Sequence, residues 1–262
     1  MILYMPASPS AASIIVPTYR EQPNLRPLVQ RIFGAVAPAG IEAEVIVIDD
    51  DSRDGTEQTV QALQADYPVR LIVRREERGL ATAVMAGMKA ARHDCFVVLD
   101  ADLQHPPELI PALIAKLTAD RCDIVIGTRY GGGAIDDDWP PLRRLASRVA
   151  TLLARPLARL SDPMSGFFAI PRDTWERATE LDPIGYKIAL ELYVKARCRR
   201  PGEVPIRFAA RAGGQSKLTA AEQVRYLRHL VRLYRFRFPW LAGAVTVLII
   251  AALAVAAWTA AR

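Results

Sequence analysis

The chain has 262 residues, a formal net charge of +6 and hydrophobic residues at 51% of its positions. This composition excludes a disordered or collagen-like chain, and the length is that of one large domain or two small ones with a buried core. The excess charge does not indicate a nucleic-acid binder, because residues 1–216 hold 27 basic and 27 acidic residues and the surplus lies near the C-terminus.

Short apolar runs rich in β-branched residues alternate with helical patterns through the first half of the chain. We expect strands at Ser13–Pro17, Glu44–Asp50, Arg70–Arg74, Cys95–Asp100 and Asp123–Thr128. We expect helices at Asn24–Val36, Thr56–Ala65 and Gly79–Ala91, and a fourth that opens at Pro106-Pro107. This order predicts an α/β fold with a mostly parallel sheet, helices on both faces and a ligand site at the carboxyl ends of the strands. The glycine-rich stretch Gly131–Pro141 predicts a flexible loop.

The sharpest chemical signal follows the fourth predicted strand. Asp100 and Asp102 are two residues apart at a strand end and can face one cation, and Gln104 can add a neutral oxygen. Oxygen ligands of this kind suit Mg²⁺ or Mn²⁺, which usually bind substrate phosphates as well. The structural alternative is that Asp102 caps the helix that follows.

A second acidic cluster, Asp49–Asp51, ends the second predicted strand. The following residues have a structural explanation, because Asp54-Gly55 is typical of a turn and Thr56 of a helix N-cap. That explanation does not cover three successive carboxylates, one of which can accept hydrogen bonds from a nucleobase or ribose. The phosphate-loop, dinucleotide-binding, HExxH and GxSxG motifs are all missing from the sequence, which disfavours four large enzyme classes.

The C-terminal region explains the excess of positive charge. Leu241–Ala261 contains 21 residues without a charge, which as a helix would span about 31 Å, the thickness of a bilayer core. We therefore expect a single C-terminal membrane anchor with residues 1–237 on the cytoplasmic side. Residues 220–238 have the pattern of a basic amphipathic helix. This indicates an interfacial helix, or a solvated charged face whose apolar side packs on the domain, and both can hold at once. These features predict three parts, 1–216, 217–238 and 239–262.

Eight motifs occur in the order found in family 2 glycosyltransferases with a GT-A fold, and the chain resembles the dolichol-phosphate (polyprenol-phosphate) mannose synthase branch. The motifs are IIVPTYRE, VIVIDDDSRDGT, RGLATAVMAGMKAA, VVLDADLQHPPE, IVIGTRY, the GGG–W–R–S stretch, DPMSGFF and RAGGQSKL. The resemblance runs from about Ser13 to Leu218. Processive polysaccharide synthases of the superfamily carry QxxRW and several spans, which this chain lacks.

The resemblance implies roles for the matched residues. For the nucleotide-sugar donor it implies Pro17, Tyr19, Glu21, Asp49 and Asp100, and for the metal Asp100, Asp102 and Gln104. For the acceptor phosphate it implies Arg129, Arg143, Ser147, Arg211 and Lys217. Asp102, Arg129 and Arg143 would contribute most directly to catalysis. The two arginines suit this role because the arginine fork matches phosphate oxygens. The alternative for each arginine is a surface or lipid contact.

The implied reaction is an inverting transfer of mannose from GDP-mannose to the phosphate of a polyprenyl phosphate at the cytoplasmic membrane face, with Mg²⁺ or Mn²⁺. The alternative is a UDP-sugar donor (glucose, galactose or an aminosugar) with the same acceptor. A non-enzymatic membrane scaffold is disfavoured because Asp100, Asp102 and Gln104 are all intact. The implied partners are the donor, the lipid acceptor and the membrane, without nucleic acid, and self-association stays open.

Overall fold

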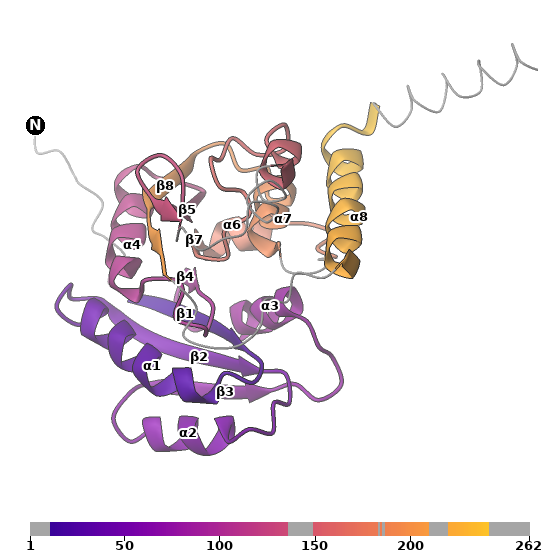
Figure 1. Cartoon of the computed structure of the whole chain (residues 1–262). Helices are drawn as coiled ribbons and strands as arrows, with labels where there is room; N and C mark the ends of the chain where they lie inside the picture. The colour runs from indigo at the N-terminus through magenta and orange to yellow at the C-terminus, as the bar shows by residue number, and fades with distance from the viewer. Residues whose placement is uncertain (1–10, 136–148, 183, 185–186, 210–219, 241–262) are drawn as a thin grey trace, which may run out of the picture.

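The computed structural model describes residues 11–135, 149–182, 184, 187–209 and 220–240 (Figure 1). The strands of the main sheet are β1 (Ala11–Thr18), β2 (Glu42–Asp49), β3 (Val69–Val73), β4 (Cys95–Val98), β5 (Ile124–Thr128), β7 (Phe168–Pro171) and β8 (Pro201–Pro205). The helices are α1 (Gln22–Val36), α2 (Thr56–Leu63), α3 (Leu80–Ala90), α4 (Ile110–Ala119), α6 (Arg172–Arg177), α7 (Ile188–Lys195) and α8 (Ala220–Arg237), with a 3₁₀ turn, η1 (Pro107–Leu109), before α4.

The main sheet has the strand order β3-β2-β1-β4-β7-β5-β8. Its strands are parallel except β7, which runs antiparallel between β4 and β5. The predicted mostly parallel α/β sheet is therefore confirmed. Because β1, β2, β4 and β5 point the same way, their carboxyl ends meet at one edge, and the segment that leads into β7 reaches the same edge.

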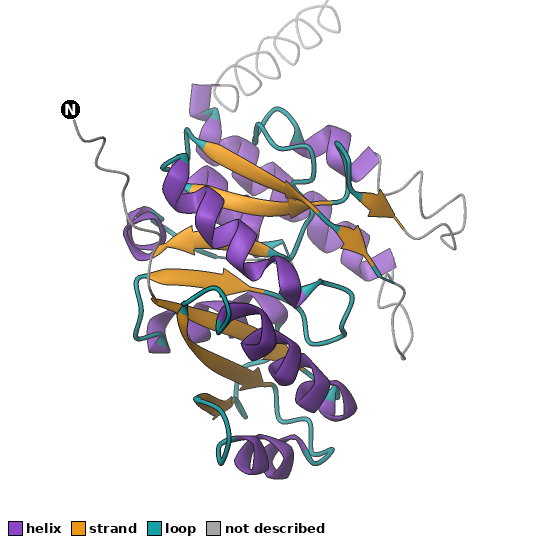
Figure 2. Cartoon of the chain, turned by 90° about the vertical axis from the view of Figure 1, so that its left-hand side faces the viewer, coloured by secondary structure: helices purple, strands orange, loops and turns teal. Residues whose placement is uncertain are grey.

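Helices cover both faces of the sheet, as Figure 2 shows. The side chains of β1 alternate between two cores, so that Ile14 and Val16 pack with α1, α2 and α4, and Ile15 packs with α3, α7 and α8. Gly87 lets α3 lie directly on the sheet, because a Cβ there would stand 2.5 Å from a side-chain carbon of Ile15. Strands buried on both faces in this way read as continuous apolar runs in the sequence.

Several local predictions need correction. The stretch Gly131–Pro141 is not wholly a loop, because β6 (Ala134–Ile135) pairs in parallel with β9 (Arg207–Phe208). Thr56 does not cap α2 but begins it, and its N–H and hydroxyl both donate to Asp54 Oδ1, at 3.1 and 2.7 Å.

Helix α8 packs on the domain through one apolar face and leaves other apolar side chains exposed. Tyr226, Leu230 and Leu233 are buried against the domain, whereas Leu227 is 51% exposed and Val231 is 57% exposed. The helix therefore has a packed face and a second apolar stripe that faces outward. No helix within the described ranges is long and apolar enough to cross a membrane, and the predicted anchor at Leu241–Ala261 lies outside them.

Candidate active site

The sheet places the predicted donor residues at neighbouring strand ends. Thr18 pairs with Asp49 in the register of β1 and β2, and the Asp50 N–H donates to the Thr18 carbonyl at 3.2 Å. Pro17 lies within β1, and Tyr19 follows it directly. This edge of the sheet therefore brings together the ends of two strands that are about 30 residues apart in sequence, as the sequence predicts.

Asp49 is buried and held by its own turn. It accepts hydrogen bonds from the Ser52 N–H at 2.9 Å and from the Ser52 hydroxyl. Glu21 accepts a hydrogen bond from Asn24 Nδ2 at 2.7 Å, in the first turn of α1. The Tyr19 ring lies under the guanidinium of Arg78, 5.8 Å from its centroid. These contacts fix the carboxylates and the ring at the end of β1 and β2.

The middle carboxylate of the acidic cluster has a structural role. Asp50 is buried with Arg74, whose Nε donates to Asp50 Oδ1 at 2.8 Å, and it also accepts the Gly79 N–H at 2.8 Å. Arg74 in turn donates to the Thr82 hydroxyl. Asp50 therefore ties the end of β2 to the start of α3, so its carboxylate is held by contacts within the fold.

The Asp100–Gln104 motif forms the turn just beyond β4. Asp102 Oδ1 accepts the Gln104 N–H at 3.2 Å, so Asp102 stabilises this turn and is not the cap of the following helix. Gln104 Nε2 donates to the Ala209 carbonyl at 3.0 Å. Of the two amide atoms, only the oxygen is of a type that could ligate a cation. Both side chains are buried.

His105 positions the first carboxylate of this motif, a role that the sequence does not indicate. Its Nδ1 accepts the Asp100 N–H at 3.1 Å, and it lies 3.7 Å from Asp100 Oδ2. The buried ring stacks on Phe167, with centroids 5.5 Å apart, and meets the edge of Phe208 at 5.4 Å. Because Nδ1 acts as an acceptor here, the proton of the neutral ring is on Nε2.

The residues present fit a divalent cation. A Cβ on Gly166 would stand 3.3 Å from Asp100 Oδ2, so glycine keeps the space beside that carboxylate open. Among the described residues no three His, Cys, Asp or Glu side chains gather as a metal-binding group. The two carboxylates and the amide oxygen of this one turn are oxygen donors of the kind that Mg²⁺ and similar cations bind together with substrate phosphates.

Arg129 lies at the opposite side of the site, at the end of β5. Its guanidinium forms a two-point ion pair with Asp162, through Nε at 2.7 Å and Nη2 at 2.8 Å. Asp162 is fully buried, and its Oδ2 also accepts the Arg129 N–H at 3.2 Å. Sequence reasoning missed Asp162, although an acidic residue between apolar segments in the DPMSGFF motif was a usable signal. Arg143, Ser147, Arg211 and Lys217 lie outside the described residues.

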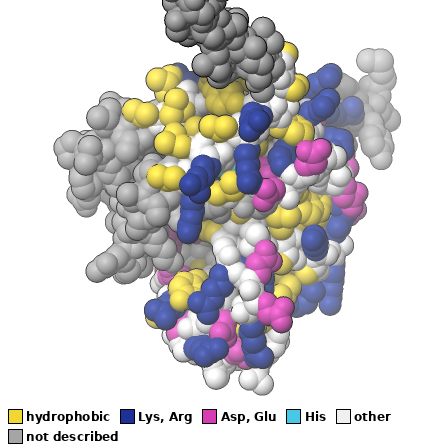
Figure 3. Space-filling view, turned by 90° about the vertical axis from the view of Figure 1, so that its right-hand side faces the viewer, with side chains coloured by type: hydrophobic (Ala, Val, Ile, Leu, Met, Phe, Trp, Pro, Cys, Tyr) yellow, Lys and Arg dark blue, Asp and Glu magenta, His cyan; other side chains and the backbone are white. Residues whose placement is uncertain are grey.

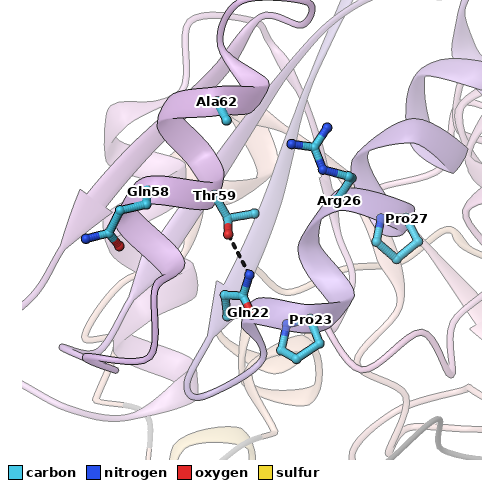
Figure 4. Close-up of a pocket in the computed structure, with 7 residues that line it drawn as sticks. All are labelled: Gln22, Pro23, Arg26, Pro27, Gln58, Thr59 and Ala62. Atoms are coloured by element: carbon cyan, nitrogen blue, oxygen red, sulfur yellow. Dashed lines mark hydrogen bonds between the residues drawn. The ribbon is translucent and has the colours of Figure 1, made fainter.

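A pocket of about 430 Å³ between α1 and α2 is a competing location (Figure 4). Its lining includes Gln22, whose Nε2 donates to the Thr59 hydroxyl at 2.7 Å, and its only charged side chain is Arg26. None of the predicted site residues lines it. Asp100 and Asp102 after β4, together with the largely buried Arg129 after β5, therefore make the better candidate for catalysis.

Sequence comparison decides the family. The family model described as Glycosyl transferase family 2 matches residues 13–177, which include most of β1 and the Asp100–Gln104 motif. The chain belongs to glycosyl transferase family 2. It is 44% identical over 262 residues to a dolichol-phosphate mannosyltransferase of Mycosarcoma maydis, covering 97% of this chain and 89% of that protein. It is 43% identical to the Saccharomyces cerevisiae protein of the same name, covering 86% of this chain and 88% of that protein.

A third relative, the dolichol-phosphate mannosyltransferase of Pyrococcus furiosus, is 45% identical over 228 residues, and the match spans 64% of its length. Among solved structures, glucosyl-3-phosphoglycerate synthase from Mycobacterium tuberculosis, in complex with Mn²⁺ and UDP-glucose, has a TM-score of 0.60 at 20% identity. That match covers 87% of this chain and 78% of that one. These matches identify the chain as a glycosyltransferase with the GT-A type of fold, as its sequence motifs predict.

Proposed function

We propose that this glycosyltransferase moves mannose from GDP-mannose to the phosphate of a dolichyl-type polyprenyl phosphate. The observation that carries the proposal is the 44% identity, over 97% of this chain, to a protein named dolichol-phosphate mannosyltransferase. The site is consistent with such a donor and acceptor. The carboxylates proposed to bind the donor lie at one end, and the ion pair of Arg129 with the buried Asp162 lies at the other.

The order of strands gives the site a direction. Asp49 ends β2 and Tyr19 follows β1, at the side proposed for the nucleoside. Asp100 and Asp102 follow β4 at the centre, beside the proposed diphosphate. Arg129, beyond β7, is at the side proposed for the acceptor phosphate. The reacting atoms would therefore meet between β4 and β5.

The chemistry needs orientation more than a strong base. An acceptor phosphate is already anionic at neutral pH, so its oxygen can attack the anomeric carbon while the bond from that carbon to the donor diphosphate breaks. Attack opposite the leaving nucleoside diphosphate inverts the configuration of the sugar. Arg129, held by Asp162, is fixed to orient the phosphate, and preorganisation of this kind lowers the barrier. A divalent cation at Asp100, Asp102 and Gln104, when bound, neutralises charge on the leaving diphosphate.

The outward side of α8 supports a membrane location for this reaction. Figure 3 shows hydrophobic side chains interspersed with Lys and Arg on the face that carries α8. The helix at 149–154 also has exposed apolar side chains, of which Leu152 is 62% exposed. The two helices are joined by the Tyr226 hydroxyl, which donates to the Ala150 carbonyl at 2.7 Å. An apolar and basic surface suits an anionic membrane, on the cytoplasmic side if the predicted anchor is correct.

A donor screen tests the proposed reaction. The full chain in detergent is supplied with a polyprenyl phosphate, Mn²⁺ or Mg²⁺ and one radiolabelled donor at a time, GDP-mannose or a UDP-sugar, and label is counted in the lipid fraction. We expect transfer from GDP-mannose. Transfer from a UDP-sugar alone would replace mannose with the alternative donor, and no transfer from any donor would overturn the proposal.

Two variants make the screen specific to the site. Asp102→Asn removes one charge beside the proposed cation and should lower the rate by at least about a hundredfold, as losses of one strong electrostatic contact do. Asp120→Asn removes a carboxylate from a surface pair with Lys116 and should leave the rate unchanged. Equal rates in the wild type and Asp102→Asn would contradict the metal site.

A further inference from the structure

Ser52 joins the ends of β1 and β2 through a single buried hydroxyl group. Its Oγ accepts the Arg20 N–H at 2.8 Å, across 32 residues of sequence, and the hydroxyl donates to Asp49 Oδ1. The Ser52 N–H donates to Asp49 Oδ2 at 2.9 Å. The backbone just beyond β1 is therefore tied to the carboxylate that ends β2.

A second contact holds the same turn from the same loop. The Gln22 N–H, at the start of α1, donates to Asp54 Oδ2 at 3.2 Å. The hydrogen bonds at Arg20 and Gln22 flank Glu21. The loop that follows β2 therefore sets the path of the backbone between β1 and α1.

The backbone that Ser52 holds is in a conformation that side chains disfavour. Arg20 has a φ of +58°, and Asp51, next to Ser52, has a φ of +56°. Residues other than glycine keep such values only where the surrounding structure fixes them, and they are concentrated at functional sites. The Arg20 guanidinium lies 5.2 Å from the centroid of the Tyr19 ring, so the strained turn and this ring are in contact.

The turn lies beside the crevice in which sheets of this type bind ligands. From β1 the chain continues to β2 and β3 on one side, and β4 lies on the other side of β1. Open α/β sheets bind ligands where the strand order reverses in this way, outside the carboxyl ends of the strands. Tyr19 lies just beyond β1 and Asp100 just beyond β4, so both border that reversal.

We propose that Ser52 is a positioning residue for the donor, and that it holds the Tyr19–Arg20 turn against Asp49 in the conformation that receives the nucleoside. This inference rests on the proposed function and adds to it the residue that joins the two strand ends. Ser52 acts through Tyr19 and Asp49, because its hydroxyl and its N–H both bind groups of the fold. A turn fixed before binding loses less conformational freedom when the donor binds.

Calorimetric titration of the full chain with the Mn²⁺–GDP complex tests the proposal. Ser52→Ala removes the hydroxyl from two buried contacts, so we expect the dissociation constant to rise by about tenfold. Ser52→Thr keeps the hydroxyl and should retain most of the affinity. The KM for a polyprenyl phosphate should stay unchanged in both variants, because the proposed acceptor side lies at the end of β5.

Ser13 offers a matched control near the opposite end of β1. It is fully buried, its hydroxyl donates to Glu44 Oε1 at 2.7 Å, and it accepts the His93 N–H at 3.1 Å. Ser13→Ala therefore loses the same two kinds of partner, a carboxylate and a backbone N–H. We expect both alanine variants to unfold at lower denaturant concentrations than the wild type, and only Ser52→Ala to bind Mn²⁺–GDP more weakly.

Two results would overturn the proposal: an unchanged dissociation constant in Ser52→Ala, or an equal rise in Ser52→Ala and Ser13→Ala. A wild-type chain that does not bind Mn²⁺–GDP would instead refute the proposed donor, so the two failures are distinguishable.

Hydrogen exchange in the wild type tests the same link should Ser52→Ala fail to fold. We expect Mn²⁺–GDP to slow exchange of the Arg20 amide, which donates to Ser52, and to leave the His93 amide, which donates to Ser13, unchanged. No protection at Arg20, or equal protection at both amides, would contradict a role of this turn in donor binding.

Discussion

At the scale of single residues, the turn that carries the proposed metal ligands is held by a neighbouring histidine. His105 Nδ1 accepts a hydrogen bond from the Asp100 N–H, and its ring packs against the rings of Phe167 and Phe208. Partners that orient a metal ligand typically change metal affinity by about 10–100-fold when removed. His105 is therefore a positioning residue whose effect should appear in metal dependence.

His105→Phe tests this role because phenylalanine suits the aromatic surroundings but offers no acceptor. We expect the concentration of Mn²⁺ that gives half-maximal transfer to rise by about tenfold or more. We also expect an activation midpoint closer to the wild type in His105→Asn, because the amide oxygen can replace Nδ1 as the acceptor. An unchanged midpoint in His105→Phe would show that the ring only fills space.

At the scale of elements, α8 is joined to α7 by a buried cluster of charges. Glu191 is 1% exposed, accepts the Asp182 N–H at 2.9 Å and pairs with His229 Nε2 at 3.1 Å and Lys195 Nζ at 3.0 Å. Burial raises the pKa of Glu191, but the hydrogen bonds from His229, Asp182 and Lys195 outweigh it, and the net pKa lies below the usual 4.5. The outer helix is therefore fixed to the catalytic domain by an ionised carboxylate.

The lowered pKa of Glu191 makes the free energy of unfolding depend on pH. Because the folded pKa is lowered, Glu191 contributes stability above about pH 4.5 and loses it as the pH falls through the folded pKa. Glu191→Gln should cost about 3 kcal/mol of unfolding free energy at neutral pH, since it leaves buried partners uncompensated. The difference from wild type should shrink as the medium becomes more acidic than the folded pKa.

Chemical denaturation at several pH values measures this difference. Glu108→Gln is the matched control, because it breaks the solvent-exposed pair with Arg31 and should cost at most about 1 kcal/mol. A difference between wild type and Glu191→Gln that stays constant down to the most acidic condition would contradict the proposed role of the ionised carboxylate.

The elements also show where sequence reasoning succeeds and fails. The strand ends that carry Asp49 and Asp100 were predictable, because continuous apolar runs identify buried parallel strands and these have a common direction. The antiparallel β7 has the same apolar character, so nothing in its sequence reveals its direction or its position between β4 and β5.

The missed site residues depend on contacts that no local pattern encodes. Asp162 pairs with Arg129 across 33 residues of sequence, and the His105 ring stacks on Phe167 from a distant segment. The amphipathic pattern of α8 was recognised, but not which of its faces packs on the domain, because spacing defines a helical face without saying what covers it. Only the packing of Tyr226 and Leu230 reveals that Leu227 faces outward.

At the scale of the whole molecule, the charge and apolar surface suggest how a soluble donor and a lipid acceptor would meet. The surplus of positive charge lies in residues 217–237 and at Arg262, next to the uncharged stretch of Leu241–Ala261. Each basic residue near an anionic surface is worth about 1 kcal/mol, so α8 alone should bind such a surface in a salt-dependent way. The anchor and the helix would thus act together, the first to retain the enzyme and the second to orient it.

Vesicle flotation separates these two contributions. The full chain should float with vesicles of any lipid charge, whereas a chain without residues 239–262 should float only with anionic vesicles at low salt. Adding Leu227→Glu and Val231→Glu to the truncated chain should abolish that binding, because both side chains are more than half exposed on α8. Gln30→Glu, a change at an exposed residue of α1, should leave it intact. If the truncated chain ignores anionic vesicles, α8 is a packed helix whose charges face only water, and orientation must come from the anchor.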